Sequence, residues 1–116
     1  MGTDKTKERS TILIVDDSKM NREMLSEILK DDYNTLEAAD GAEAVAVLKE
    51  HDIDLVLLDI VMPGMDGFEV LSIMNRYNWI EYIPVIMISS EGDFSYIKKA
   101  YDLGATDYIR RPYQSY

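Results

Sequence analysis

The sequence predicts an α/β fold in which one open, parallel sheet is covered by helices on both faces. Short runs of β-forming residues alternate five times with longer segments that carry apolar residues at helical spacing, which is typical of βαβ units. Three of the runs are apolar throughout, as expected for parallel strands that are buried on both faces. We therefore expect a doubly wound sheet of five strands.

The apolar runs are predicted to be central strands, and two more polar runs are predicted to be edge strands. The central strands are TILIV (11–15), LVLL (55–58) and VIMI (85–88). YNTLEA (33–38) mixes polar and apolar residues, and DYI (107–109) is short, so we expect both at the edges of the sheet.

Two apolar stripes predict the core faces of the first two helices. The first stripe comprises Met20, Met24, Leu25, Ile28 and Leu29, and the second is centred on Ala44, Val45 and Leu48.

Helix ends are predicted from capping signals. Asp40 with Glu43, and Asp66 with Glu69, have the spacing of a capping box, so helices are expected to begin there. Asp93 is expected to cap a fourth helix that runs through residues 97–101. Gly104 stands where a left-handed residue would end that helix.

Composition limits the class of protein and its partners. The 116 residues fit one domain, with residues 1–10 (MGTDKTKERS) as a flexible polar leader that lacks the features of a signal peptide. The formal net charge of −10 disfavours nucleic acids and anionic membranes as partners. With no cysteine, and with apolar runs far shorter than the ~20 residues of a membrane span, we expect a cytoplasmic protein.

Polar side chains follow four of the predicted strands directly, and these side chains are expected to meet at the carboxyl edge of the sheet. They are Asp16 and Asp17, Asp59, Ser89, and Arg110 with Arg111. Two carboxylates ~4 Å apart repel by about 4 kcal/mol at an effective dielectric near 20, so a cation is required. Oxygen ligands of this kind favour Mg²⁺. A nucleophile (Asp59), a hydroxyl donor (Ser89) and a fixed cation (Arg111) would then suit phosphoryl transfer.

Four motifs in this order resemble the receiver domain of two-component response regulators, from about Thr11 to Tyr113. The motifs are LIVDD, LLDIVMPGMDG, ISSE and YIRRPY. The resemblance implies a flavodoxin-like fold with strand order 2-1-3-4-5. It implies that Asp59 is the phosphoacceptor, with Asp17 on Mg²⁺ directly and Asp16 mostly through water.

The resemblance also assigns several supporting roles. The carbonyl of Val61 would complete the protein ligands of the metal, and Ser89 would hydrogen-bond the phosphoryl oxygen. Tyr108 would swing inward when Ser89 is drawn toward the phosphate, so that these two residues form the switch. Gly64 and Gly67 would permit the tight backbone of the loop beside the acceptor.

The chain departs from the family pattern in two places. Arg111 stands where the family has a lysine before Pro112, whose preceding peptide bond is expected to be cis. The last residues, QSY, are too short for the usual fifth helix, so residues 11–116 are expected to form a receiver that lacks its C-terminal helix. An apolar patch beside the first helix would then be open to solvent. A longer parent chain with an output domain, a dimer or another partner would be needed to cover it.

The leading hypothesis is a signalling switch that accepts a phosphoryl group on Asp59 from a histidine kinase or a phosphotransfer protein. It would modify itself without being an enzyme toward other substrates. One alternative is a pseudo-receiver that is never phosphorylated and serves as an interaction module. Another, a phosphatase, is disfavoured because Val61 stands where a second catalytic aspartate would be needed. Taken singly, Asp16 and Asp17 could cap the first helix, Ser89 could be a turn residue and Tyr108 a buried aromatic.

Overall fold

The computed structural model describes residues 9–90 and 94–111 of the chain. Five parallel strands form one sheet in the order β2-β1-β3-β4-β5, which confirms the predicted fold class and strand order. The strands are β1 (Thr11–Val15), β2 (Asn34–Ala38), β3 (Leu55–Asp59), β4 (Val85–Ser89) and β5 (Asp107–Arg110). As predicted, the two more polar strands, β2 and β5, lie at the edges.

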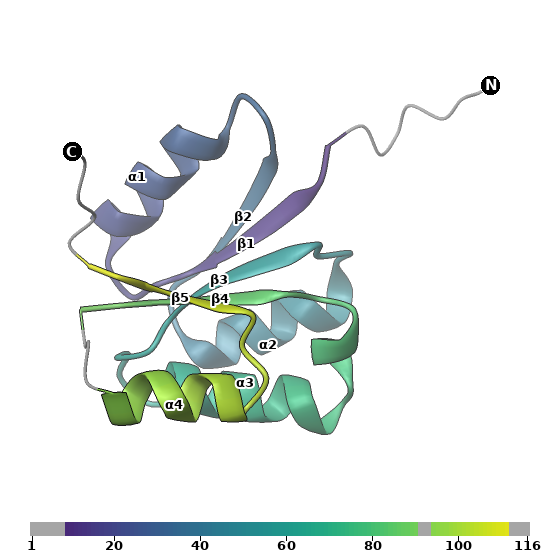
Figure 1. Ribbon diagram of the computed structural model, residues 1–116. Helices are drawn as coiled ribbons and strands as arrows, with labels where there is room; N and C mark the ends of the chain where they lie inside the picture. Colours follow the sequence, from purple (N-terminus) through teal and green to yellow (C-terminus); the bar gives the residue numbers. More distant parts are fainter. Residues whose placement is uncertain (1–8, 91–93, 112–116) are drawn as a thin grey trace.

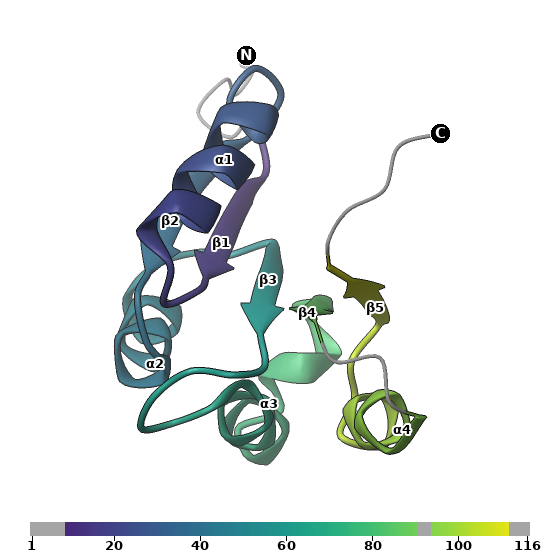
Figure 2. The same ribbon diagram turned by 90° about the vertical axis from the view of Figure 1, so that its left-hand side faces the viewer.

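Helices lie on both faces of the sheet (Figure 1). The helices in the described ranges are α1 (Lys19–Leu29), α2 (Gly41–Glu50), α3 (Gly67–Arg76), the short 3₁₀ helix η2 (Trp79–Glu81) and α4 (Phe94–Asp102). Helix α1 lies on one face, whereas α2, α3 and α4 form a row on the other (Figure 2). None of these helices is both long and apolar enough to cross a membrane.

The predicted helix starts are largely confirmed. Asp66 and Glu69 form a complete capping box, with Oδ1 of Asp66 2.9 Å from the Glu69 amide and Oε1 of Glu69 2.9 Å from the Asp66 amide. Asp40 caps α2 through the Glu43 amide, but the Glu43 side chain accepts from Ala39 instead of from Asp40.

The start of helix α1 does not agree with the alternative that Asp16 and Asp17 cap this helix. Ser18, and not Asp16 or Asp17, is its N-cap. Asp93, the expected cap of α4, lies outside the described residues, as do Pro112 and most of the leader. Gly104 has the predicted left-handed conformation, with φ of 110°.

The core is unequal on the two faces of the sheet. The larger cluster fills the space under α2, α3 and α4, and includes Leu13, Leu58, Leu71, Met74 and Met87. The smaller cluster, on the face of α1, consists of Ile12, Ile14, Leu57 and Ile88.

The prediction that the first apolar stripe is an ordinary core face is wrong for three of its five residues. No side chain of α1 is buried in the described structure, and Met20 and Ile28 are 78% and 64% exposed. Met24 is exposed as well, and only Leu25 and Leu29 pack against the small cluster. Helical spacing identified an apolar stripe, but it cannot show whether a neighbouring element covers the stripe.

An apolar groove lies beside α1, as expected from the sequence. Helix α1 contacts β1 and β2, whereas the groove extends over β3 and β4. The groove has a volume of about 400 Å³, and its lining includes Ile12, Leu29, Tyr33, Leu55, Leu57 and Ile86.

Candidate functional site

The predicted site residues come together at the carboxyl edge of the sheet. Asp16 directly follows β1, Asp59 and Ser89 end β3 and β4, and Arg111 follows β5. One carboxylate oxygen from each of Asp16, Asp17 and Asp59 lies within 4.8 Å of the others. The parallel register brings these strand ends to the same level, because Asp59 pairs with Ile88, the residue before Ser89.

Two of the three carboxylates are buried. Asp16 and Asp59 are only 2% and 5% exposed, whereas Asp17 is exposed. The first turn of α1 holds the Asp16 side chain: Oδ1 accepts from the Ser18 amide at 2.9 Å, and Oδ2 accepts from Nδ2 of Asn21 at 3.3 Å. Arg22 donates to the Asp16 carbonyl oxygen at 2.8 Å. The segment that carries the carboxylates is therefore fixed before any ligand binds.

Arg111 bridges the two buried carboxylates. Its Nη1 lies 2.8 Å from Oδ2 of Asp16, and its Nη2 lies 2.8 Å from Oδ1 of Asp59. The sequence predicted a cation at this position but not the bridge, which depends on the fork of the guanidinium and on the spacing of three strands. Arg110, one residue earlier, is exposed.

Burial and neighbouring negative charge both raise the pKa of Asp59. Burial, followed by the nearby charge of Asp16, raises the pKa of Asp59 from 3.8 to about 6, and Asp17 adds to this effect. Arg111 and a hydrogen bond from the Val61 backbone act in the opposite direction without cancelling the rise. Three ionised carboxylates and one guanidinium leave a formal charge of −2, which one divalent cation would neutralise.

The residues present fit a Mg²⁺ ion. The three clustered side chains offer only carboxylate oxygens, the hard ligands that Mg²⁺ prefers, and the exposed Asp17 leaves room for the waters that this ion retains. Val61 lies two residues after Asp59, and its backbone lies near enough to the Asp59 carboxylate to lower the pKa of that group. Coordination by the Val61 carbonyl stays a prediction.

The two predicted switch residues lie on neighbouring strands behind the site. Ser89 is 1% exposed, and its carbonyl oxygen accepts from the Arg111 amide at 2.7 Å. Tyr108 pairs with Met87 across β4 and β5, is half-buried and packs against the larger core. Its movement between two positions stays a prediction.

The loop from β3 to α3 returns very close to the end of β3, where Asp59 lies. Gly67 donates from its amide to the Ile60 carbonyl oxygen at 2.8 Å, and a Cβ added at Gly67 would lie 2.3 Å from the Asp59 carbonyl oxygen. Gly64 has a φ of 75°, which confirms its predicted turn conformation. Residue 67 must therefore be glycine for β3 and α3 to meet at this distance.

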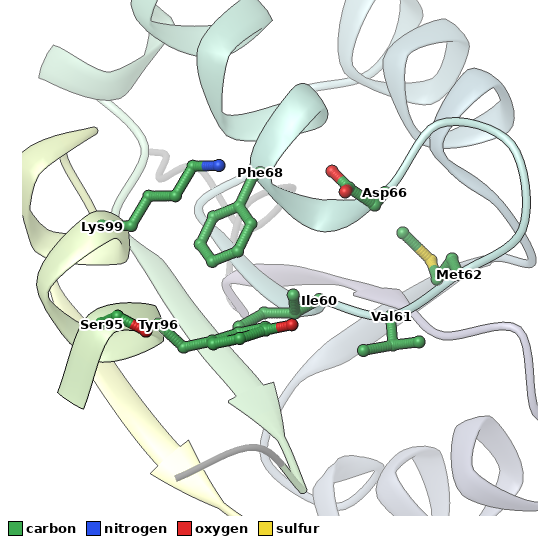
Figure 3. A pocket seen from close by; sticks show the side chains of 8 residues that line it. All are labelled: Ile60, Val61, Met62, Asp66, Phe68, Ser95, Tyr96 and Lys99. Carbon is green, nitrogen blue, oxygen red and sulfur yellow. The ribbon is translucent and has the colours of Figure 1, made fainter. Parts of the chain in front are cut away.

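A pocket that the sequence did not predict adjoins this loop (Figure 3). It has a volume of about 460 Å³ and lies between the segment 60–68 and α4. On its wall, Nζ of Lys99 lies 4.6 Å from the ring centroid of Phe68, which in turn is 5.8 Å from the ring of Tyr96. The sequence did not predict this pocket because Phe68 lies in α3 whereas Tyr96 and Lys99 lie in α4, so these residues form no recognisable motif.

Comparisons with known proteins agree with this geometry. The family model of the response regulator receiver domain matches residues 12–115. The chain is 43% identical over 104 residues to the chemotaxis protein CheY of Halobacterium salinarum, covering 89% of this chain and 85% of that protein. It is 41% identical over 102 residues to a probable cyclic di-GMP phosphodiesterase of Vibrio cholerae, covering 88% of this chain but 23% of that protein.

A solved structure gives the same result. It is a complex of CheX and CheY with BeF₃ and Mg²⁺ from Borrelia burgdorferi. The matched chain superposes with a TM-score of 0.82 at 40% identity, covering 90% of this chain and 80% of that one. The strand order, the acidic cluster at the sheet edge and these matches together lead to one conclusion: the chain belongs to the response regulator receiver domains of two-component signalling systems.

Proposed function

We propose that this domain is a phosphorylation-dependent switch that accepts a phosphoryl group on Asp59 in the presence of Mg²⁺. The observation that carries the proposal is the position of Asp59, a 5% exposed carboxylate with two further carboxylates and a guanidinium around it. With a pKa of about 6, Asp59 is mostly ionised at neutral pH and can act as a nucleophile.

In the proposed step, a carboxylate oxygen of Asp59 attacks the phosphorus of the donor. The bond between phosphorus and the donor breaks, and the leaving group keeps the electron pair. Bound Mg²⁺ would neutralise the carboxylates and the incoming phosphoryl oxygens. Asp16, Asp17, Asp59 and the Val61 carbonyl would hold the metal, Ser89 would donate to a phosphoryl oxygen, and Arg111 would supply the fixed positive charge.

The signal would arise from the charge that the phosphoryl group adds, about −1.5 to −2. Ser89 and Tyr108 would respond to it and shift α4 and β5 between two states, so that phosphorylation acts by population shift. The phosphodonor would be a histidine kinase or a phosphotransfer protein in the cytoplasm. The domain would turn over no separate substrate.

The output of the switch would depend on a partner or on further sequence in a longer parent chain. A receiver can form a small part of a much larger protein, as the 23% coverage of the probable cyclic di-GMP phosphodiesterase illustrates. The chemotaxis protein of H. salinarum is, in contrast, covered over most of its length. Both arrangements are compatible with the proposed switch.

Labelling with a small acyl phosphate tests the proposal. The intact mass should increase by one phosphoryl group when Mg²⁺ is present, and should not increase with EDTA or in Asp59→Asn. As a matched control, Asp32→Asn removes an exposed carboxylate outside the site and should leave the labelling unchanged.

One observation favours the alternative, an interaction module that is never phosphorylated. Arg111 already pairs with both buried carboxylates, so the site has an internal cation. If Mg²⁺ does not bind, and neither an acyl phosphate nor a phosphorylated histidine donor adds mass to the chain, that alternative replaces the switch.

A further inference from the structure

We propose that Arg111 competes with Mg²⁺ for Asp16, so that the metal binds only when the guanidinium releases one of its two carboxylates. This inference rests on the proposed metal-dependent function and adds a residue that sets the metal affinity. It is specific to an arginine at this position.

The geometry of the bridge carries the proposal. Nη1 and Nη2 of Arg111 contact different aspartates, each at 2.8 Å, and both carboxylates are almost fully buried. A planar guanidinium can bond two carboxylates at once because its donors are spread over a fork. A lysine ammonium is a single point of charge on a shorter side chain, and it would favour one carboxylate at a time.

The oxygens of Asp16 show why the metal and the guanidinium compete. Oδ2 accepts from Nη1 of Arg111 and from Nδ2 of Asn21, and Oδ1 accepts from the Ser18 amide. Oδ2, with two lone pairs that already accept two hydrogen bonds, has little capacity left for a metal or a metal-bound water. Oδ1 keeps one lone pair, but a cation bound there would lie next to the guanidinium charge held on the same carboxylate. The Arg111 contact, at 2.8 Å between full charges, is stronger than the 3.3 Å contact of Asn21.

Release of Asp16 does not require β5 to leave the sheet. The Arg111 amide donates to the Ser89 carbonyl oxygen at 2.7 Å, and Arg110 pairs with Ser89 in the strand register. The backbone is therefore anchored while the side chain turns. After release from Asp16, the guanidinium still lies next to Asp59, where an added phosphoryl group would need a cation.

Substitution can distinguish the effect of the Arg111 bridge on metal affinity from the effect of the positive charge at this position. Arg111→Lys keeps the positive charge and removes the fork, so any gain in metal affinity reflects the lost bridge and not weaker repulsion. Arg110→Lys makes the same change one residue earlier, on an exposed side chain outside the bridge. These two variants form a matched pair.

The test is calorimetric titration of the metal-free 116-residue chain with MgCl₂. Arg111→Lys should bind Mg²⁺ at least about ten-fold more tightly than the unmodified chain, and Arg110→Lys should bind it equally well. Calorimetry is preferred to intrinsic fluorescence because Trp79 lies far from the site. Trp79 is in η2, between the end of α3 and the start of β4, and the site lies at the other end of the strands.

A second readout uses the unmodified chain and does not depend on the folding of a variant. The side-chain Nε–H resonance of Arg111 in ¹⁵N NMR should move on addition of MgCl₂, because Nη1 leaves the Asp16 carboxylate. An unchanged resonance, or an equal Mg²⁺ affinity in Arg111→Lys, overturns the competition while the switch stands. If none of the three chains binds Mg²⁺, the proposed function fails, and the competition fails with it.

Discussion

At the residue scale, the site is governed by negative charge that its own cation does not fully neutralise. Burial and the charge of Asp16 raise the pKa of Asp59 to about 6 from 3.8. Between these two values the folded metal-free protein binds more protons than the unfolded chain. Its free energy of unfolding must therefore fall as the pH rises through this window, with the full penalty present above about pH 6.

Asp59→Asn is expected to remove this pH dependence. The substitution keeps the shape of the side chain and deletes the charge. It should therefore raise the free energy of unfolding of the metal-free chain at neutral pH by about 1–2 kcal/mol, and should have little effect at a pH below 4. Urea unfolding followed by circular dichroism at both pH values measures the difference. If the free energies of unfolding of the two proteins change with pH in parallel, the charge of Asp59 does not destabilise the folded chain.

Asp17 offers a second prediction, because it is the exposed member of the cluster. Asp17→Asn should leave the metal-free stability within about 0.5 kcal/mol. It should also abolish most of the stabilisation by Mg²⁺, which for the unmodified chain amounts to about 2.7 kcal/mol at a hundred-fold excess over Kd. Thermal melts with and without MgCl₂ test this, with Asp32→Asn as the control that keeps the full response. An equal metal response in Asp17→Asn would remove Asp17 from the ligands.

At the element scale, the junction between β3 and α3 fixes the position of Asp59. A Cβ at Gly67 would lie 2.3 Å from the Asp59 carbonyl oxygen and 2.8 Å from Cα of Ile60. These contacts are with backbone atoms of Asp59 and Ile60, which cannot move away from an added Cβ as the end of a flexible side chain can. Any side chain at this position must therefore push the start of α3 away from the end of β3.

Gly67→Ala is accordingly expected to lower the free energy of unfolding by about 2–3 kcal/mol and to slow phosphorylation of Asp59. Gly64→Ala is the comparison, because its Cβ meets nothing within 4 Å and only the positive φ of 75° is unfavourable. That variant should cost about 1 kcal/mol and leave the Asp59 strand in place. Equal costs for the two variants, with equal labelling rates, would contradict a role of this contact in placing Asp59.

The elements also show which parts of the structure the sequence could predict. The central strands were recognisable because runs such as LVLL are apolar on both faces, and the helix starts because Asp66 and Glu69 satisfy local backbone groups. The burial of Met20 and Ile28 was predicted wrongly, since periodicity reveals a stripe and not the element that would cover it. The Arg111 bridge was missed because it depends on the relative positions of β1, β3 and β5 in space.

At the scale of the whole molecule, the two faces of the sheet are covered unequally. Three helices cover one face, whereas in the described structure α1 alone lies over the other, mainly above β1 and β2. The groove over β3 and β4 is lined mainly by apolar side chains, including Leu55, Leu57 and Ile86. Apolar patches of this kind on soluble domains mark surfaces that bind other groups.

This 116-residue chain is therefore expected to bind a hydrophobic dye in its folded state and to sediment with a concentration-dependent coefficient. Ile86→Thr keeps a β-branched side chain in the strand but adds a hydroxyl to the groove. It should lower the dye fluorescence and the self-association, at a cost of about 1–2 kcal/mol in the free energy of unfolding. Tyr82→Thr removes a 77% exposed aromatic side chain outside the groove and should change neither readout. A single monomeric species that does not bind the dye would mean that the groove is covered in solution by this chain itself.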